Sequence, residues 1–496
     1  MDAAALRPAH PSPRPLRELL DAVPGLRVAR DAPLSGVTVT GCSLDSRTIR
    51  PGDLYAALPG DNTHGAVFAD QALAAGAVAV LTDEQGAAGF PGVPVLVSDA
   101  PRTVLGEVAA WVHDYPASSL MLLGVTGTNG KTTTAFLIEA GLRAAGLPSA
   151  LLGTVLSRIG DLEVTSIRTT PEATDLQAMF ALMRERGVEA VSMEVSSHAL
   201  ALGRVDGLRF ATSVFTNLSQ DHLDFHPSME AYFQAKASLF EPGRSGRGVI
   251  NADDAAGRRL LAAAGDLSSF STGDADADWR ATDVVLRPDG STFRLVGPEV
   301  SVDASVQLPG DFNVSNAVAA IACLVTSGVP VDDSVRGVGS LTGVPGRMER
   351  VDLGQPFTAL VDYAHTPAAV ETLLRSVRQV TSGRVILVLG CGGDRDAAKR
   401  ALMGRAAVEG SDVAVLTSDN PRGEDPLAIL AQMGQQGAVI EPDRRAAITW
   451  AVAQAAPGDA VVIAGKGHER GQETAGVVLP FDDREVLREA LREVVA

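Results

Sequence analysis

The chain has 496 residues, which is too many for one hydrophobic core and predicts about three domains. Apolar residues make up 46% and charged residues 21%, as in ordinary globular proteins, and no apolar run is long enough for membrane insertion. The net charge of −18 and the aromatic content of 4% argue against a nucleic acid as partner. The three cysteines lie far apart, which argues against a disulfide framework or a zinc site and for a reducing cytoplasm.

The first block of the chain predicts a short leader followed by an α/β domain. Residues 1–16 are rich in proline, lack the apolar core of a signal peptide and predict a disordered leader. Residues 17–118 follow as the first predicted domain, with a strand over residues 77–81 and a helix around residues 68–75. Residues 113–119, which contain Pro116, predict a linker.

Residues 124–134 are the most informative stretch of the sequence. They read Gly-Val-Thr-Gly-Thr-Asn-Gly-Lys-Thr-Thr-Thr and stand between a predicted strand and a predicted helix. A glycine-rich turn there exposes backbone N–H groups at a helix N-terminus, where the helix dipole favours an anion. Lys131 adds a charge for terminal phosphates and Thr132 a hydroxyl for Mg²⁺. The strict phosphate-loop pattern needs glycine at position 125, where this chain has Val125, so the sequence predicts a variant phosphate loop.

Two further blocks predict parallel sheets. In the second predicted domain, residues 119–348, near-continuous apolar runs at residues 190–195 and 210–216 alternate with helical segments. The third predicted domain, residues 349–496, is expected to be doubly wound α/β. Its predicted strands cover residues 357–361, 385–389, 413–417 and 460–464.

Polar segments follow these predicted strands. They cover residues 194–198, 216–226, 362–366, 390–395, 418–422 and 465–469. Ligands of open α/β sheets bind outside the carboxyl ends of the strands. Six capped turns by chance would not concentrate His, Asp and Arg at one edge, so this edge is the predicted site.

The residue types of the predicted site indicate nucleotide and metal chemistry. Glu194 and the Thr132 hydroxyl suit Mg²⁺, which prefers oxygen ligands and keeps several waters. His222 alone would more often be a structural hydrogen-bonding group, and beside Asp221 and Asn217 the metal interpretation becomes equally good. No Ser-His-Asp set or partnered nucleophilic Cys is evident, so the substrate's own nucleophile is expected to attack ATP.

Arg422 is the best candidate for binding a carboxylate, because its planar guanidinium matches a carboxylate with two hydrogen bonds. Pro421 restricts the backbone before it. The alternative is a surface ion pair of Arg422 with Glu424 or Asp425. Arg395 and Glu469 are weaker candidates on the same grounds. Lys236, in a helical pattern, is expected from its spacing alone to be an ordinary solvated lysine.

Together these motifs resemble the Mur ligase family. The matching segments are residues 126–133, 194–198, 216–222, 346–349 and 362–365 with Asn313 and Asn316, and in the first block residues 44–47 and 51–60. Within the family, residues 419–422 and 465–469 are similar to those of the member that adds diaminopimelate to UDP-N-acetylmuramoyl-L-alanyl-D-glutamate. The resemblance implies a cytoplasmic, monomeric, ATP-dependent amide ligase of peptidoglycan synthesis. Its first domain would bind the uridine nucleotide, its second ATP with two Mg²⁺ ions, and its third the amino acid.

The resemblance also implies the roles of individual residues. Lys131, Glu194, His222 and Lys236 match catalytic positions; Thr132, Glu194, His222 and a carbamylated Lys236 match metal positions. The ATP positions are Gly127, Thr128, Asn129, Gly130, Lys131, Thr132, Thr133, Asn316, Arg347 and Asp362. The UDP-substrate positions are Leu44, Ser46, Asp61, Asn62, Thr63, Thr169, Thr170, Ser196 and Arg204. The diaminopimelate positions are Arg395, Asp419, Asn420, Pro421, Arg422, Gly465 and Glu469.

Two positions depart from the family pattern. Arg168 stands where some members have Asn, and Leu202 where some have Gln, so no substrate contact is assigned to either. Three alternative functions are weighed: a ligase adding lysine, a folate-polyglutamylating enzyme, and a nucleotide-regulated binding protein without catalysis. Arg422 argues against the first, the uridine-type first block against the second, and the complete set of catalytic residues against the third.

Overall fold

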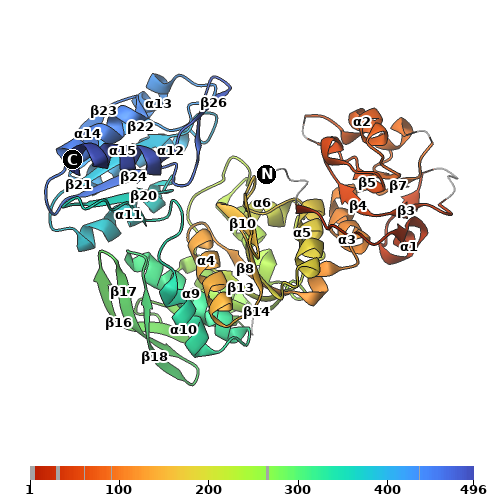
Figure 1. Ribbon diagram of the computed structural model, residues 1–496, viewed down its shortest axis with the longest axis horizontal. Helices are drawn as coiled ribbons and strands as arrows, with labels where there is room; N and C mark the ends of the chain where they lie inside the picture. The colour runs from red at the N-terminus through yellow and green to blue at the C-terminus, as the bar shows by residue number, and fades with distance from the viewer. Residues whose placement is uncertain are drawn as a thin grey trace. The chain divides into compact units, whose positions relative to one another are not determined.

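The computed structural model describes residues 6–29, 34–60, 62–90, 92–263, 267–434 and 436–495 (Figure 1). The chain forms two compact units. The first comprises Met1–Thr126, Gly146–Ser213 and Ala235–Gly248, and the second Gly127–Ala145, Val214–Gln234 and Val249–Ala496. This division differs from the predicted boundaries near residues 118 and 348, which stay predictions. Among the helices of the described residues, none combines the length and the apolar character needed to cross a membrane.

A five-stranded sheet in the order β2-β7-β6-β5-β4 forms the core of the N-terminal region. Its strands are β2 (Arg27–Val28), β4 (Gly41–Ser43), β5 (Asp53–Ala56), β6 (Ala79–Thr82) and β7 (Val95–Val97). Strands β4 to β7 are parallel, and apolar clusters lie on both faces. Helices α1 (Leu16–Ala22) and α3 (Pro101–Val112) pack on one face and α2 (Ala69–Ala74) on the other. The strand and the helix expected in this block correspond to β6 and α2.

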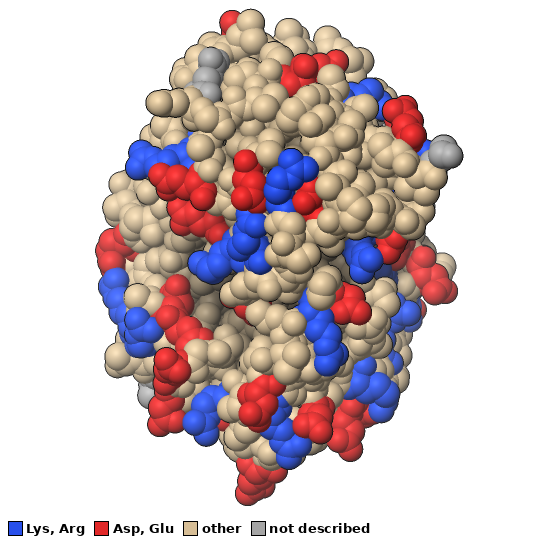
Figure 2. Space-filling model, turned by 90° about the vertical axis from the view of Figure 1, so that its left-hand side faces the viewer, with Lys and Arg blue, Asp and Glu red and all other residues tan. Residues whose placement is uncertain are grey.

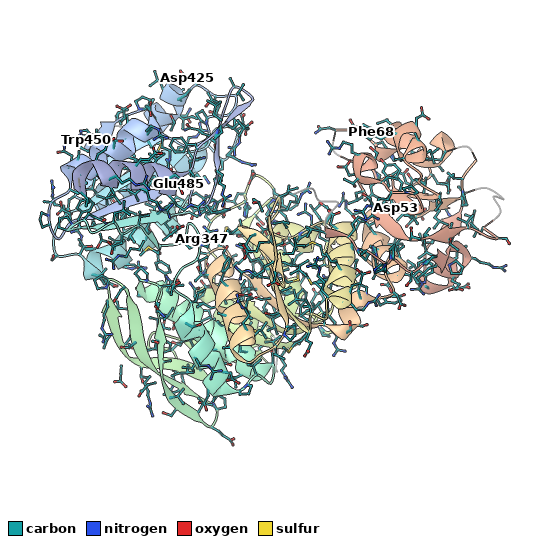
Figure 3. The ribbon with its side chains drawn as sticks, in the orientation of Figure 1. Asp53, Phe68, Arg347, Asp425, Trp450 and Glu485 are labelled. Atoms are coloured by element: carbon teal, nitrogen blue, oxygen red, sulfur yellow. The ribbon has the colours of Figure 1, made fainter. Side chains whose placement is uncertain are left out.

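The beginning of the described chain is ordered, unlike the expected leader. Both guanidinium nitrogens of Arg7 donate to the buried carboxylate of Asp53, at 2.7 and 2.6 Å; Asp53 is labelled in Figure 3. Strand β1 (Arg14–Pro15) pairs with β3 (Thr38–Val39), and the Arg14 guanidinium lies 4.2 Å from the ring centroid of Trp111. The proline-rich composition that indicated disorder gives no sign of these long-range partners.

The largest sheet has eleven strands in the order β11-β10-β9-β12-β8-β13-β14-β15-β16-β17-β18. Its strands are β8 (Met121–Thr126), β9 (Ser149–Leu152), β10 (Leu156–Ile159), β11 (Leu162–Thr165), β12 (Ala190–Glu194), β13 (Phe210–Phe215), β14 (Ser245–Asn251), β15 (Leu267–Ser271), β16 (Trp279–Arg287), β17 (Gly290–Gly297) and β18 (Val300–Val306). Strands β8, β12 and β9 are parallel, as the apolar runs predicted, whereas β9-β10-β11 and β16-β17-β18 are antiparallel. The helices of this region are α4 (Lys131–Ala144), α5 (Ala173–Glu185), α6 (Ser197–Ala201), α7 (Met229–Ala237), α8 (Ala255–Ala263), α9 (Asp311–Thr326) and α10 (Val331–Ser340).

A six-stranded sheet in the order β19-β20-β24-β21-β22-β23 forms the C-terminal region. The strands are β19 (Glu349–Arg350), β20 (Thr358–Asp362), β21 (Val385–Cys391), β22 (Val413–Ser418), β23 (Ala438–Ile440) and β24 (Ala460–Ala464). All but β19 are parallel, and the four predicted strands correspond to β20, β21, β22 and β24. Their valines, leucines and isoleucines are buried, except for the partly buried Val413, which explains why the sequence runs are continuously apolar.

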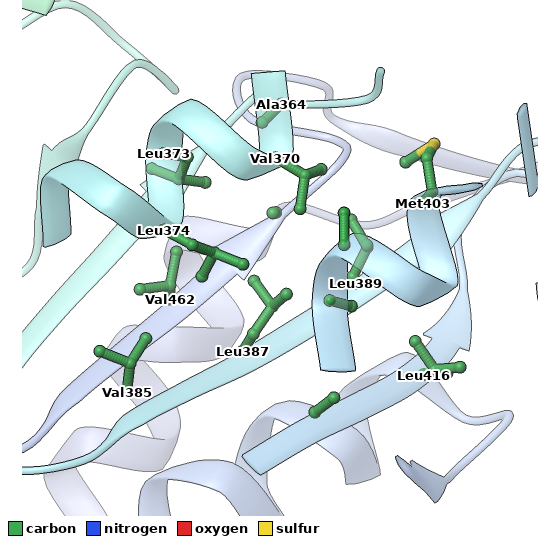
Figure 4. Packing of buried hydrophobic residues seen from close by; sticks show 14 of the residues in the cluster. Ala364, Val370, Leu373, Leu374, Val385, Leu387, Leu389, Met403, Leu416 and Val462 are labelled. Atoms are coloured by element: carbon green, nitrogen blue, oxygen red, sulfur yellow. The ribbon is translucent and has the colours of Figure 1, made fainter. Parts of the chain in front are cut away.

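Helices cover both faces of this C-terminal sheet. Helices α11 (Pro367–Val380), α12 (Ala398–Gly410) and α13 (Pro426–Met433) pack on one face, in the cluster drawn in Figure 4. Helices α14 (Arg444–Gln454) and α15 (Asp483–Val495) pack on the other, with the β25 (Gly471–Thr474) and β26 (Val477–Pro480) hairpin before α15. The predicted doubly wound architecture is therefore present.

A buried ion pair joins α14 to α15. The Arg444 guanidinium donates to both carboxylate oxygens of Asp483 at 2.7 Å, and both side chains are fully buried. The remaining donors reach two strand ends, the carbonyl of Ser418 at 3.2 Å and that of Ala464 at 2.9 Å. Arg444 therefore fixes the carboxyl ends of β22 and β24 to the C-terminal helix.

Replacing Asp483 with Ala is expected to lower the free energy of unfolding by about 3–5 kcal/mol, because the Arg444 guanidinium is left buried without a counter-charge. Urea unfolding followed by circular dichroism measures the loss. Glu489→Ala is the matched control, since Glu489 pairs with Arg445 across the same two helices with side chains 53% and 55% exposed. That exposed pair is expected to contribute less than about 1 kcal/mol. Equal losses in the two variants would contradict the anchoring role of Asp483.

Candidate active site

The phosphate loop follows β8 and ends where α4 begins at Lys131. Gly127 and Gly130 have φ angles of 148° and 86°, which residues other than glycine rarely adopt. Thr216 and Asn217 support the turn: the Thr216 hydroxyl donates to the carbonyl of Asn129 at 2.6 Å, and the Asn217 Oδ1 accepts from the N–H of Asn129 at 2.9 Å. The predicted strand, loop and helix are present, and a polar segment far along the sequence holds the loop in shape.

The cation of the loop is folded back over it. The Nζ atom of Lys131 donates to the carbonyls of Gly127 at 2.9 Å and Thr128 at 2.8 Å. Next to it, the Thr132 hydroxyl accepts from Nη2 of Arg347 at 3.2 Å. Arg347, labelled in Figure 3, also lies 4.2 Å from the ring centroid of Tyr363. The structure therefore brings two predicted cations to the start of α4, where a phosphate is favoured.

Two further predicted ATP residues are held in fixed orientations. Asn316, buried on α9, accepts from the Thr134 hydroxyl at 3.3 Å and donates to Oδ1 of Asn313 at 2.9 Å. Asp362 accepts from the backbone N–H groups of Met348 and Ala364, both at 2.8 Å. Burial raises the pKa of Asp362, opposed chiefly by the charge of Arg347.

His222 stands at a strained position, with a φ of 54° and a side chain that is 40% exposed. Its Nε2 lies 3.4 Å from Oδ2 of Asp221, whose Oδ1 accepts from the N–H of His222 at 2.9 Å. Burial acts to raise the pKa of Asp221, but the neighbouring His222, His365 and Lys399 outweigh it and lower that pKa. Asp221 therefore stays a carboxylate and orients the imidazole.

Glu194 ends β12 as a buried carboxylate. Its Oε1 accepts from the backbone N–H of Thr154 at 2.6 Å and its Oε2 from the Thr154 hydroxyl at 3.0 Å. The same hydroxyl lies 3.1 Å from that of the predicted Thr169. Thr154 was missed in the sequence, because it belongs to none of the quoted motifs and meets Glu194 only through the sheet.

Four predicted substrate residues, one of them the Thr169 just described, meet beside Glu194. The Thr170 hydroxyl donates to the Glu194 carbonyl at 2.9 Å and lies 3.3 Å from the hydroxyl of Ser196, which caps α6. Nη1 of Arg204 donates to the carbonyl of Thr170 at 3.2 Å. The structure thus brings Thr169, Thr170, Ser196 and Arg204 together.

Glu172 was missed in the sequence, although it gathers three arginines. Its carboxylate lies 2.8 Å from Arg204, 3.6 Å from Arg102 and 3.9 Å from Arg168. Burial lowers the pKa of Arg204, and the charge of Glu172 opposes that effect. Arg168, one of the two departures from the family pattern, is therefore the outermost arginine of this cluster.

The predicted uridine-nucleotide residues differ in exposure. The buried Ser46 donates to Oε1 of Gln71 at 2.8 Å, Leu44 is half-buried, and Asn62 and Thr63 are exposed. Asp61 lies outside the described residues. These assignments stay predictions.

Lys236 is not the solvated lysine that its spacing suggested. The residue is 1% exposed, on α7. The expectation of an exposed lysine failed because Lys236 lies on the buried side of α7, with Tyr232 and Phe233, whereas Glu230 and Gln234 are exposed. A buried ammonium is costly unless it is partnered or modified, so Lys236 must be in one of these two states.

The predicted amino-acid residues gather after β22 and β24. Nδ2 of Asn420 donates to Oε2 of Glu469 at 2.8 Å, and both meet Lys466, which was missed in the sequence although it follows the predicted Gly465. Gly465 has a φ of 111°, and a Cβ there would lie 2.8 Å from Oδ2 of Asp419. Arg395 is exposed.

The sequence left open a surface ion pair of Arg422 with Glu424 or Asp425, but the structure gives Arg422 other partners. Its Nη1 donates to the carbonyl of Gly393 at 2.7 Å, and its Nε lies 3.5 Å from the carboxylate of Glu473. Glu424 instead pairs with Arg400 at 2.7 Å. Backbone bonds of Arg422 to Glu473 and Ala475 join it to the β25–β26 hairpin, so Pro421 and the hairpin together hold the guanidinium in place.

Charge on the face of the molecule in Figure 2 is mixed. Basic and acidic side chains of the described residues are interspersed on that face.

Three family models match the chain. The Mur ligase family catalytic domain matches residues 38–111, the Mur ligase middle domain residues 125–324, and the Mur ligase glutamate ligase domain residues 346–467. They follow one another along the chain and confirm the predicted α/β fold class with three domains.

Whole-length relatives support the same family. A protein of Streptomyces avermitilis named UDP-N-acetylmuramoyl-L-alanyl-D-glutamate--2,6-diaminopimelate ligase is 55% identical over 502 residues, covering 98% of both chains. A protein of that name from Corynebacterium glutamicum is 46% identical over 477 residues, covering 92% of both. A solved structure of a protein of that name has a TM-score of 0.69 and 34% identity, covering 98% of this chain and 100% of the other.

Gly127→Ala is expected to weaken ADP binding at least about tenfold, since a Cβ at this position would overlap Oγ1 of Thr216 and distort the loop. Gly146→Ala is the matched control: Gly146 also has a positive φ, 75°, but a Cβ added there would meet no heavy atom within 4 Å. Both variants carry backbone strain, and only the first disturbs the loop. Isothermal titration with ADP measures the difference; equal affinities would contradict the steric argument.

The motifs, the fold and the similarities agree. The expectation of an ATP-dependent ligase of peptidoglycan synthesis, with ATP as co-substrate, is confirmed at the level of the family. The chain belongs to the Mur ligase family.

Proposed function

We propose that the chain joins 2,6-diaminopimelate to UDP-N-acetylmuramoyl-L-alanyl-D-glutamate with hydrolysis of ATP to ADP and phosphate. The observation that carries the choice of amino acid is Arg422, whose guanidinium is held by the carbonyl of Gly393 and lies 3.5 Å from the carboxylate of Glu473. A fixed guanidinium suits a carboxylate, which diaminopimelate has at its far end and lysine lacks. The name and the 55% identity of the Streptomyces avermitilis relative support the same choice.

The reaction has two steps. The D-glutamate side-chain carboxylate attacks the γ-phosphorus of ATP; an O–P bond forms, the bond to ADP breaks, and an acyl phosphate results. The amine of diaminopimelate then attacks the acyl carbon, phosphate leaves, and the nitrogen loses a proton. Lys131 and Arg347 stabilise charge on the phosphoryl oxygens, while Asn316 and Asp362 hold the adenosine. In the substrate, the uridine part binds Leu44, Ser46, Asp61, Asn62 and Thr63, and the peptide part binds Thr169, Thr170, Ser196 and Arg204.

The donor types fit Mg²⁺. Glu194 and Thr132 offer oxygens, and a carbamate on Lys236 would convert a buried cation into an oxygen donor. Within the described ranges no group of three or more His, Cys, Asp or Glu could hold a metal ion, so water and phosphate oxygens would complete the shell. We assign Thr132, Glu194, His222 and a carbamate of Lys236 as the residues that would hold two magnesium ions, and these ions would neutralise phosphate charge. The proposed enzyme is a cytoplasmic monomer.

A phosphate-release assay tests the function. The chain is incubated with ATP, Mg²⁺ and the UDP-linked dipeptide, and diaminopimelate or lysine is added. Diaminopimelate is expected to stimulate phosphate release and lysine is not. Stimulation by lysine alone would overturn the choice of amino acid, and no stimulation by either would overturn the proposed reaction. Lys131→Ala gives the background of the assay.

Lys236→Ala is expected to abolish activity and to regain part of it with a short carboxylate such as acetate, because the proposed role requires an anion at this position. Lys236→Arg keeps a cation there and is expected to stay inactive. Steady-state phosphate release measures both variants, with melting temperatures as the folding control. Wild-type activity in the arginine variant would reject the carbamate.

Arg422→Ala is expected to lower kcat/KM for diaminopimelate about 30-fold or more, the effect of losing one partner of a desolvated charge pair. The Michaelis constants for ATP and the UDP-linked dipeptide are expected to change little. Arg492→Ala is the control, since Arg492 is exposed in the last turn of α15. If the constants for ATP and diaminopimelate rise together, or neither rises, Arg422 does not bind the distal carboxylate.

A further inference from the structure

Lys466, to which no role has been assigned, contacts residues of the proposed amino-acid pocket. Lys466 is 0% exposed and follows the end of β24. Its Nζ donates to Oδ1 of Asn420 at 2.9 Å and to Oε2 of Glu469 at 3.1 Å, and lies 3.8 Å from Oδ1 of Asp419. A buried ammonium is tolerated only with such partners, and here all three partners are residues of the proposed pocket.

The ammonium fixes the orientation of the Asn420 amide. Oδ1 of Asn420 accepts from Lys466 and from the backbone N–H of Glu473 at 3.0 Å, while Nδ2 donates to Oε2 of Glu469 at 2.8 Å. A flipped amide would set its NH₂ group against two donors. Lys466 therefore acts with the N–H of Glu473 and the carboxylate of Glu469 to set the amide so that Asn420 presents its second N–H as a donor.

Glu469 is oriented by the same contacts. Both hydrogen bonds go to its Oε2, which leaves the other oxygen to accept from an ammonium group of a ligand. Without the charge of Lys466, the carboxylates of Asp419 and Glu469 would repel each other. With it, the three side chains carry one net negative charge, which suits a cationic amino group.

The backbone at this place has a separate support. Arg444 binds the carbonyls of Ser418 and Ala464, the residues directly before Asp419 and Gly465. The ends of β22 and β24 are therefore held without Lys466. What Lys466 adds is the orientation of the side chains that follow these ends.

We propose that Lys466 is a positioning residue for the incoming amino acid, acting through Asn420 and Glu469. It sets the amide to donate to a carboxylate and the glutamate to accept from an ammonium, the two groups found at each end of diaminopimelate. The inference rests on the proposed function, because that function makes this cluster the amino-acid pocket.

Lys466→Met keeps the length of the side chain and removes the charge. It is expected to raise the KM for diaminopimelate about tenfold or more, the effect of losing a charge-assisted hydrogen-bond network. The KM for ATP is expected to stay within about twofold, and the melting temperature shows whether the variant is folded. A folded variant with an unchanged KM for diaminopimelate overturns the proposal.

A double-mutant cycle separates positioning from general packing. If Lys466 acts through Glu469, then Lys466→Met combined with Glu469→Gln raises the KM by less than the product of the single effects. Independent effects, which multiply, overturn the proposal. Should Lys466→Met unfold, Asn420→Ala decides: it removes the amide that accepts from the ammonium and donates to Glu469, and an unchanged KM overturns the proposal.

The two proposals fail differently. If the proposed function is wrong, the wild-type protein shows no phosphate release that depends on diaminopimelate. If only the role of Lys466 is wrong, the wild-type protein is active, Glu469→Gln raises the KM for diaminopimelate, and Lys466→Met does not.

Discussion

A charge that folding removes from water must meet a counter-charge or a full set of hydrogen-bond partners, and this constraint shapes the structure from end to end. Arg7 meets Asp53 in the first sheet, and Arg444 meets Asp483 in the last. Glu194 is buried against the N–H and hydroxyl of Thr154. In each case the partner comes from a segment distant in sequence, so each pair also ties two elements together.

The parallel strands of the C-terminal sheet determine where charged side chains lie together in the proposed site. The carboxyl ends of β20, β21, β22 and β24 lie at one edge of their sheet. Asp362 is the last residue of β20, and the segments that follow β22 and β24 carry Asp419, Asn420 and Lys466. Because the strands are buried on both faces, their sequence is mostly apolar, and charged side chains concentrate where the strands end. Residues that form the core and residues proposed to take part in binding or catalysis are thereby separated along the chain.

The C-terminal region uses two buried cations for two different tasks. Arg444, a planar donor with several N–H groups, spans two backbone carbonyls and a carboxylate, and so fixes the strand ends. Lys466, a compact point charge, donates to the side chains of Asn420 and Glu469 in the loops after β22 and β24. A guanidinium matches groups spread in a plane, whereas an ammonium suits oxygens that converge on one point, and each cation stands where its shape fits.

The sequence alone determined the fold class, the phosphate loop and four of the six strands of the C-terminal sheet, because apolar runs, glycine spacing and turn residues act locally. It did not determine the state of Lys236, the ordered residues 6–16 or the partners of Arg422 and Glu194. Thr154, Glu172 and Lys466 escaped notice for the same reason. Burial and pairing depend on which strands become neighbours, and strand order is a property of the tertiary structure. Residues far apart in sequence acquire their chemistry only when the sheet brings them together.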